Sequence, residues 1–191
     1  TPTPATPSRP QITHGANTTI EQQQEFEALL DSLPESVRAQ LKAEGIVFAH
    51  DRRVTDFRPD LKTQHPRGWP PGSTWDHVGA FFDDGTKTVL VSREILQGKS
   101  YVPMKRFEGA LFHETGHAVD VAFGDLSRHP KFLAAYKADA LKMPVQDRGK
   151  LEYFLQSGEA GPQEAFAELF TNLIGKTSSI SDKIDKSFVR A

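Results

Sequence analysis

The sequence predicts an α+β fold, in which a single, mostly helical domain contains a small mixed or antiparallel sheet. A chain of 191 residues is long enough to form one domain with its own core. Short apolar runs bounded by turn residues lie mainly in the first half of the chain, and stretches with the helical period fill the second half. A few strands followed by helices are typical of the α+β class.

Residues 1–17 predict a flexible tail, and residues 18–191 predict the folded domain. In the tail, "TPTPATPSRPQ" alternates proline with small polar residues, which cannot bury a core. The domain begins with "TTIEQQQEFEALLDSL", whose apolar residues share one side of a helix capped by Thr18 or Thr19. "PESVRAQLKAEG" predicts a second helix that stops at Gly45.

The middle of the chain predicts strands. "IVFAH" (46–50) predicts a short strand, and residues 78–92 predict a hairpin whose turn is Asp84-Gly85. Residues 56–77 carry four prolines and little periodicity, which indicates an irregular surface segment. The remainder is predicted to be helical, at about 105–123, after Pro130, near 146–155, from Pro162 to Gly175, and at the end of the chain.

The composition argues against several classes of function. The formal net charge is −2, which gives no reason to expect a nucleic acid or an anionic membrane as partner. No apolar run approaches the roughly 20 residues that a membrane-spanning helix needs. The chain contains no cysteine, so any metal must be held by histidine and carboxylate side chains.

The segment "FHETGHAVD" (112–120) has the pattern of a metal site. His113 and His117 stand four residues apart on a predicted helix, so both imidazoles share a face and can reach one ion. Glu114 projects to the side of the pair, where it can contact a water. Chance produces this pattern in about one of a hundred such sequences. The apolar residues on either side of it indicate a buried helix, in which buried polar groups are costly and a bound metal relieves that cost.

A catalytic zinc site of this kind needs a third protein ligand from elsewhere in the chain. In "GPQEAFAELF", Glu164 and Glu168 are four residues apart on a predicted helix, and either carboxylate can face the ion with the other behind it. The alternative is that both are solvated surface charges. Asp120 lies three residues after His117 on the same face, where it either holds an imidazole N–H or belongs to the helix surface.

These residues resemble the zinc metallopeptidases related to anthrax lethal factor, and more closely the Pro-Pro endopeptidases, which are small secreted bacterial enzymes. The resemblance covers roughly residues 20–190 and rests on three segments in the same order. The segments are "PRGWPPGSTWDHVG" (66–79), "FHETGHAVD" (112–120) and "YFLQSGEAGPQEAFAELF" (153–170). The H-E-x-x-H pattern occurs in many unrelated families, whereas the E-x-F-A-E and Gly-x-Thr-Trp-Asp patterns are much more specific.

The resemblance implies a zincin-like fold with one Zn²⁺ ion held by His113, His117 and Glu164 on helices. It also implies that Glu168 supports the site from behind and that Tyr153 assists the reacting carbonyl. Tyr153 stands eleven residues before Glu164, which is a longer spacing than in the family and indicates a small insertion in "FLQSGEAG".

The resemblance places Trp75 at the substrate cleft, and we expect Gly79, beside the predicted edge strand, to contact the substrate as well. An extended peptide can bind along such an edge through its backbone, and a flat aromatic ring suits proline-rich chains. The alternative is that "PRGWPPGSTW" is only a packed loop. The segment "VGAFFDDGTKT" departs from the family's glycine-rich strand edge, which leaves the preference for a Pro-Pro bond open.

The expected function is a zinc-dependent endopeptidase for proline-containing substrates, with Glu114 as general base and a bond between two prolines as the candidate cleavage site. The expected partner is a proline-rich peptide or protein, and we expect a secreted monomer. Two other interpretations stay open: a toxin- or effector-like zinc protease with one dedicated protein substrate, and a catalytically inactive zinc-binding interaction domain. The Thr-Pro tail also leaves open that the chain is part of a larger protein.

Overall fold

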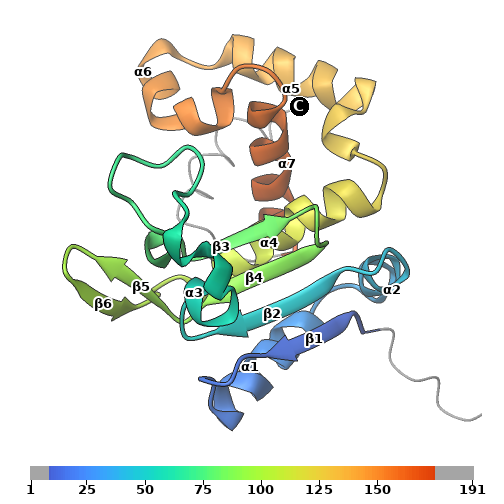
Figure 1. The fold of residues 1–191 in the computed structure, drawn as a ribbon. Coiled ribbons are helices and arrows are strands. Elements are labelled where there is room, and N and C mark those ends of the chain that lie inside the picture. The colour runs from blue at the N-terminus through green and yellow to red at the C-terminus, as the bar shows by residue number, and fades with distance from the viewer. Residues whose placement is uncertain (1–8, 175–191) are drawn as a thin grey trace, which may run out of the picture.

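The computed structural model describes residues 9–174, which form the predicted α+β fold (Figure 1). A mixed sheet has the strand order β1-β2-β4-β3. Its strands are β1 (Gln11–His14), β2 (Val47–Asp51), β4 (Thr88–Ser92) and β3 (Ala80–Asp83). The first three strands run parallel to one another, and β3 lies at the edge, antiparallel to β4. One side of β3 is therefore free of a neighbouring strand of this sheet.

Strand β1 corrects the expected boundary of the N-terminal tail. Gln11–His14 fall within the predicted tail 1–17, yet they pair with Val47 to His50 of β2. Ile12 packs against the hydrophobic core, which a mobile tail would not do. Because the partner strand is distant in sequence, no local pattern reveals this pairing. Residues 1–8 lie outside the described part of the chain.

The two N-terminal helices form where their patterns predict them. Helix α1 (Ile20–Asp31) begins with a capping box, in which Thr19 and Gln22 exchange side-chain to backbone hydrogen bonds. Helix α2 (Glu35–Ala43) follows Pro34. The chain leaves it through Gly45, whose φ of 71° is left-handed and costs little only in glycine.

Two hairpins lie in the middle of the chain. The predicted one consists of β3 and β4, and Asp84-Gly85 lies in its turn. The second consists of β5 (Glu94–Gln97) and β6 (Ser100–Pro103) and lies where the sequence pattern predicts no strand. The proline-rich segment before β3 is irregular, as expected, and contains only short turns of helix. These are the end of α3 (Val54–Phe57), η1 (Pro59–Thr63) and η2 (Trp75–His77).

The rest of the described chain is helical, as predicted. Helix α4 (Phe107–Ala122) crosses the sheet, and α7 (Ala160–Leu173) packs along α4. Figure 1 shows the remaining helices in a layer above the sheet. They are η3 (Leu126–Arg128), α5 (Pro130–Lys142), α6 (Val145–Arg148) and η4 (Gly149–Leu155). The helix predicted near 146–155 is thus a short α-helical turn followed by a 3-10 helix, and the last predicted helix lies outside the described residues.

Apolar side chains pack on both faces of the sheet, because successive side chains of β2 and β4 point to opposite faces. Phe48 and Val89 face the larger cluster, which includes residues of α1, α2 and α4. Ala49 and Leu90 face a smaller cluster beneath the proline-rich segment. Helix α4 is thereby held against the sheet next to its edge strand. None of the helices within residues 9–174 is long and apolar enough to cross a membrane.

Candidate metal centre and cleft

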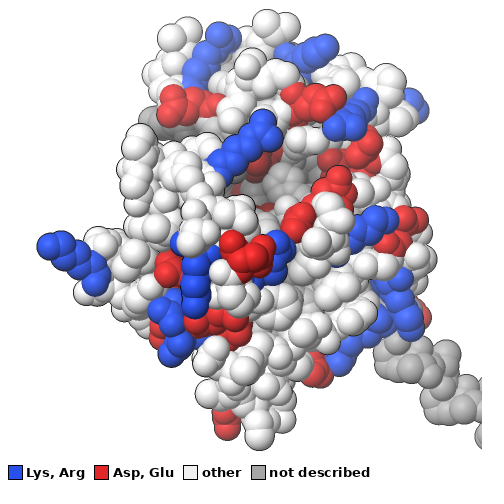
Figure 2. Space-filling view, viewed as in Figure 1, with Lys and Arg blue, Asp and Glu red and all other residues white. Residues whose placement is uncertain are grey.

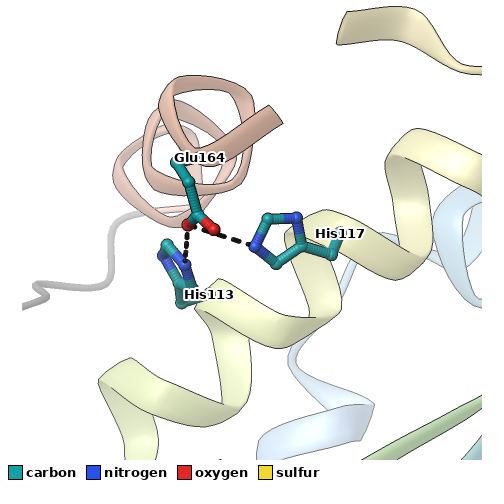
Figure 3. Close-up of side chains that lie close together, drawn as sticks. All are labelled: His113, His117 and Glu164. Atoms are coloured by element: carbon teal, nitrogen blue, oxygen red, sulfur yellow. Dashed lines mark hydrogen bonds and ion pairs between the residues drawn. The ribbon is translucent and has the colours of Figure 1, made fainter. Parts of the chain in front are cut away.

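The two histidines of α4 and a carboxylate of α7 converge on one point (Figure 3). His113 Nε2 lies 3.0 Å from Glu164 Oε2, and His117 Nε2 lies 3.3 Å from the same oxygen. One possible ligand atom from each residue falls within 4.8 Å of the other two. A tetrahedral ion with bonds of about 2.0–2.1 Å separates its ligand atoms by about 3.3 Å. These three side chains therefore fit one metal ion with little rearrangement.

Close packing of α4 against α7 makes this convergence possible. Gly116 lies between the two histidines in the helix, and a Cβ atom there would come within 2.6 Å of the Cα of Ala167. Ala165 and Ala167 are both fully buried. Small residues on both helices therefore let the backbones approach, so that Glu164 reaches the histidines of the neighbouring helix.

Glu168 lies behind the metal-facing residues. Its Oε2 atom is 3.1 Å from His113 Nδ1, and the residue is only 1% exposed. Burial lowers the pKa of His113, but the hydrogen bonds with Glu164 and Glu168 outweigh burial and raise the pKa to about 10. A carboxylate on the rear nitrogen of a ligating imidazole orients the ring and strengthens it as a donor. The geometry matches the supporting role that the resemblance implies for Glu168.

Glu164 is an anionic ligand candidate. Burial favours its neutral form, yet hydrogen bonds from His113 and His117 outweigh burial and hold the pKa of Glu164 well below its usual range. A carboxylate that stays ionised in a half-buried site, beside two imidazoles, is a donor set suited to a divalent cation.

A cleft of about 700 Å³ opens beside the three residues. Edge strand β3 forms one wall, the loop from Pro66 to Val78 forms another, and α4 and η4 complete it. Figure 2 shows the hollow between the helical layer and the sheet, with acidic side chains around it. Glu114, Trp75, Gly79 and Tyr153 all line this cleft, so the structure brings together the residues expected at the substrate.

Tyr153 faces the candidate metal centre from η4, although 49% of its surface is exposed. Burial and the neighbouring carboxylates of Glu164 and Glu114 raise the pKa of the Tyr153 hydroxyl above its ordinary value. The hydroxyl therefore stays protonated at neutral pH and can donate a hydrogen bond. Residues 156–159 connect η4, which carries Tyr153, to α7, which carries Glu164.

Asp120 takes neither of its two expected roles, since it contacts Ser127 instead of an imidazole and is only 3% exposed. Its carboxylate accepts hydrogen bonds from the backbone N–H and the hydroxyl of Ser127, both at 2.6 Å. Within the described part of the chain, no imidazole hydrogen-bonds to it. Asp120 instead fixes the turn after α4, which carries Asp125 and Arg128 to the rim of the cleft.

Contacts inside the protein hold Gly79 in place. Its carbonyl accepts hydrogen bonds from the N–H and the hydroxyl of Ser92, so it points into the protein. A Cβ atom at this position would lie 2.6 Å from the terminal carbon of Met104. Gly79 thus lines the cleft because it lies under the start of β3, next to the β5–β6 hairpin.

A second cavity of about 300 Å³ continues from the cleft toward the start of α4. Gly109 and Ala110, one turn before His113, leave this space open, and Met104 and Phe154 bound it. These four residues are not among the site residues expected from the sequence. The signal that could have found Gly109 and Ala110 is their spacing, because small residues three and four positions before His113 lie on the face of the metal site.

Comparison with known proteins identifies the relatives of this fold. The family described as "Anthrax toxin lethal factor, N- and C-terminal domain" matches residues 11–179. No curated protein sequence matches the chain. Among solved structures, the Pro-Pro endopeptidase PPEP-2 from Paenibacillus alvei has a similar fold, with a TM-score of 0.62 and 22% sequence identity over 93% of this chain and 91% of that chain. The chain described here belongs to the anthrax toxin lethal factor domain family.

Proposed function

We propose that the protein is a zinc-dependent endopeptidase that hydrolyses peptide bonds in proline-containing chains. One observation carries the proposal: His113, His117 and Glu164 surround a single point beside an open cleft, and His117, Glu164 and Glu114 line that cleft. Three protein ligands with an open position beside them are the arrangement of catalytic zinc sites, whereas structural sites are closed by four ligands.

The ligand set favours zinc over other divalent ions. Two imidazoles and one carboxylate suit zinc, while magnesium and calcium prefer all-oxygen sites. When bound, Zn²⁺ supplies Lewis acidity, which polarises a carbonyl group and makes water more acidic. The membership of the chain in the lethal factor domain family and its structural similarity to a Pro-Pro endopeptidase support this assignment.

The protein's own residues supply proton transfer and charge stabilisation. Glu114 takes a proton from the attacking water as the water oxygen bonds to the carbonyl carbon, and it returns that proton to the leaving nitrogen as the C–N bond breaks. The hydroxyl of Tyr153 donates a hydrogen bond to the carbonyl oxygen as negative charge builds there. Glu168 keeps the ring of His113 oriented during these steps.

The cleft also suggests how a substrate binds. Because β3 is an edge strand, its backbone can pair with an extended peptide laid along the cleft. Trp75, in the loop that forms another wall, offers a flat surface, which suits the rigid conformation of a proline-rich segment. The similar structure is that of a Pro-Pro endopeptidase, and we extend the preference in its name to this chain as part of the proposal. We further propose that the enzyme is secreted, as its resemblance to the Pro-Pro endopeptidases implies, and that it acts as a monomer.

A cleavage assay read by mass spectrometry tests this function. The substrates are one peptide library with Xaa-Pro-Pro-Xaa at its centre and a second library without proline. The samples are the intact protein, the protein with a chelator, the chelated protein with zinc restored, Glu114→Gln, and Glu108→Gln as the matched control. Glu108 is on the same helix as Glu114 but does not line the cleft.

We expect cleavage between the prolines by the intact protein and by Glu108→Gln. The chelator and Glu114→Gln should abolish it, and zinc should restore the chelated protein. Glu114→Gln should still bind one equivalent of zinc, because Glu114 is not a ligand in this assignment. An active Glu114→Gln protein would overturn the mechanism, and cleavage confined to the library without proline would overturn the substrate preference. Zinc binding without cleavage of any peptide would favour a dedicated protein substrate or an inactive interaction domain.

A further inference from the structure

One contact between the β5–β6 hairpin and the wall of the cleft is made by a tyrosine. The hydroxyl of Tyr101, on β6, donates a hydrogen bond to Asp76 Oδ2 at 2.7 Å. The other carboxylate oxygen of Asp76 accepts a hydrogen bond from the hydroxyl of Thr55, which is 3% exposed. Asp76 is thus held from two sides, by a buried group of α3 and by the hairpin.

Arg53 fixes the ring of Tyr101 in this position. Its guanidinium carbon lies 4.4 Å from the centre of the Tyr101 ring, in a cation–π contact. The same guanidinium is tied to Asp56 by two hydrogen bonds. Although Tyr101 is 43% exposed, its ring is therefore held between the hairpin and α3, and its hydroxyl is directed at Asp76.

Asp76 directly follows Trp75 in η2, so whatever holds Asp76 also holds the backbone of Trp75. The indole of Trp75 packs in the smaller apolar cluster, with its ring centre 4.8 Å from that of Phe81. Its Nε1 atom is buried and has no hydrogen-bond partner among the described residues. No polar contact of its own therefore orients the indole, and its position depends on packing and on the anchoring of η2.

We propose that Tyr101 and Asp76 are positioning residues, through which the β5–β6 hairpin sets the place of Trp75 in the wall of the substrate cleft. The same hairpin region also supports the start of the edge strand, since Ile95 and Met104 lie next to Gly79. The hairpin region thus contacts two parts of the cleft wall that an extended peptide would touch, η2 and the start of β3. The catalytic consequence rests on the proposed peptidase function, whereas the structural link between Tyr101 and Trp75 does not.

Removal of the Tyr101 hydroxyl should weaken substrate binding rather than the chemical step. In the proposed function Trp75 contacts the substrate but takes no part in metal binding or proton transfer, so it should contribute alike to the bound substrate and to the transition state. For Tyr101→Phe, loss of one hydrogen bond to a carboxylate should raise KM roughly three- to tenfold. Zinc content and kcat should stay unchanged.

The kinetic test is a double-mutant cycle with a Pro-Pro peptide as substrate. It compares the intact protein, Tyr101→Phe, Trp75→Phe and the double variant. Lys99→Ala, at the exposed tip of the same hairpin, serves as the matched control. If Tyr101 acts through Trp75, Tyr101→Phe should cause no further rise of KM in the Trp75→Phe background, and Lys99→Ala should behave as the intact protein. An equal rise in both backgrounds, or no rise in either, would overturn the proposal.

A fluorescence measurement tests the link without activity. The chain has two tryptophans, so Trp69→Phe leaves Trp75 as the sole indole. In that background, Tyr101→Phe should shift the emission of Trp75 to longer wavelength and increase its quenching by acrylamide, with Lys99→Ala unchanged. Identical spectra and quenching for all three would refute the positioning role. A protein that cleaves no peptide would defeat the proposed function alone, because the fluorescence comparison still decides whether Tyr101 positions Trp75.

Discussion

At the scale of the residue, the site is defined by His113, whose two ring nitrogens contact different partners. Nε2 faces Glu164 and His117, while Nδ1 contacts the buried carboxylate of Glu168. The front nitrogen is thereby left to a metal, and the rear one sets the orientation of the ring. A change at Glu168 should consequently affect the metal without removing a ligand.

Glu168→Gln should lower zinc affinity about 10- to 100-fold, because the neutral amide orients and polarises His113 less well than a carboxylate does. Competition with a chromogenic chelator measures the affinity. Glu152→Gln, which changes an exposed carboxylate next to Tyr153, is the control and should bind zinc as the intact protein does. An unaltered affinity in Glu168→Gln would show that the contact with His113 does not support the metal.

His50 is a buried histidine outside the cleft, and its charge state couples the fold to pH. Its ring stacks on Phe26 at 4.2 Å, and its two nitrogens face His14 and the guanidinium of Arg93. Burial, followed by the positive charges of Arg93 and His14, lowers the pKa of His50 from 6.5 to about 3. The folded protein therefore keeps His50 neutral where the unfolded chain protonates it.

Stability should fall on acidification because the unfolded state binds the extra proton. The contribution of His50 is complete above pH ~6.5 and is lost by about 1.4 kcal/mol for each pH unit between ~6.5 and ~3. Urea unfolding at pH 7.0, 5.5 and 4.5 measures this slope. The slope should be smaller by that amount in His50→Gln, which cannot titrate, and equal slopes in the two proteins would contradict the assignment.

At the scale of the element, the approach of α4 to α7 decides whether the ligands meet. Gly116 permits this approach because its missing Cβ leaves room for the backbone of Ala167. Backbone atoms cannot move aside as the end of a flexible side chain can. Any side chain at this position must therefore push the two helices apart.

Gly116→Ala should destabilise the fold by about 1–3 kcal/mol and lower zinc affinity, since α7 carries both Glu164 and Glu168. Chemical unfolding and metal titration provide the two measurements. Gly149→Ala is the matched control, because a Cβ atom there meets nothing within 4 Å and the backbone is already helical. Gly116→Ala with the stability and zinc affinity of the control would show that the helices tolerate separation.

At the scale of the whole molecule, the candidate metal centre joins the sheet-bound helix α4 to the helical layer through α7. An ion that binds only the folded protein stabilises it by RT ln(1 + [L]/Kd), which is about 2.7 kcal/mol at a hundredfold excess over Kd. For a chain of this size, removal of the ion should lower Tm by roughly 5–10 °C.

Calorimetry with and without a chelator measures this difference. Glu164→Ala should have the lower Tm from the start and should not respond to the chelator, because it lacks the third ligand. A chelator effect of the same size in Glu164→Ala would mean that the metal binds elsewhere.

The sequence by itself determined the features that depend on neighbouring residues. The spacing of His113 and His117 places them on one face of any helix, and the capping residues and Asp84-Gly85 mark element ends through local backbone preferences. The carboxylate pair on α7 could be singled out for the same reason. Family resemblance then selected Glu164 over Glu168, a choice that spacing alone left open.

Only the tertiary structure decided the features that depend on distant parts of the chain. The pairing of β1 with β2, the partner of Asp120 and the contact between Tyr101 and Asp76 all join residues that carry no mutual signal in the sequence. The meeting of α4 and α7 likewise depends on a missing side chain at Gly116 and not on any local pattern. The physical reason is that periodicity and capping act over a few residues, whereas packing selects among all the contacts that the chain can make.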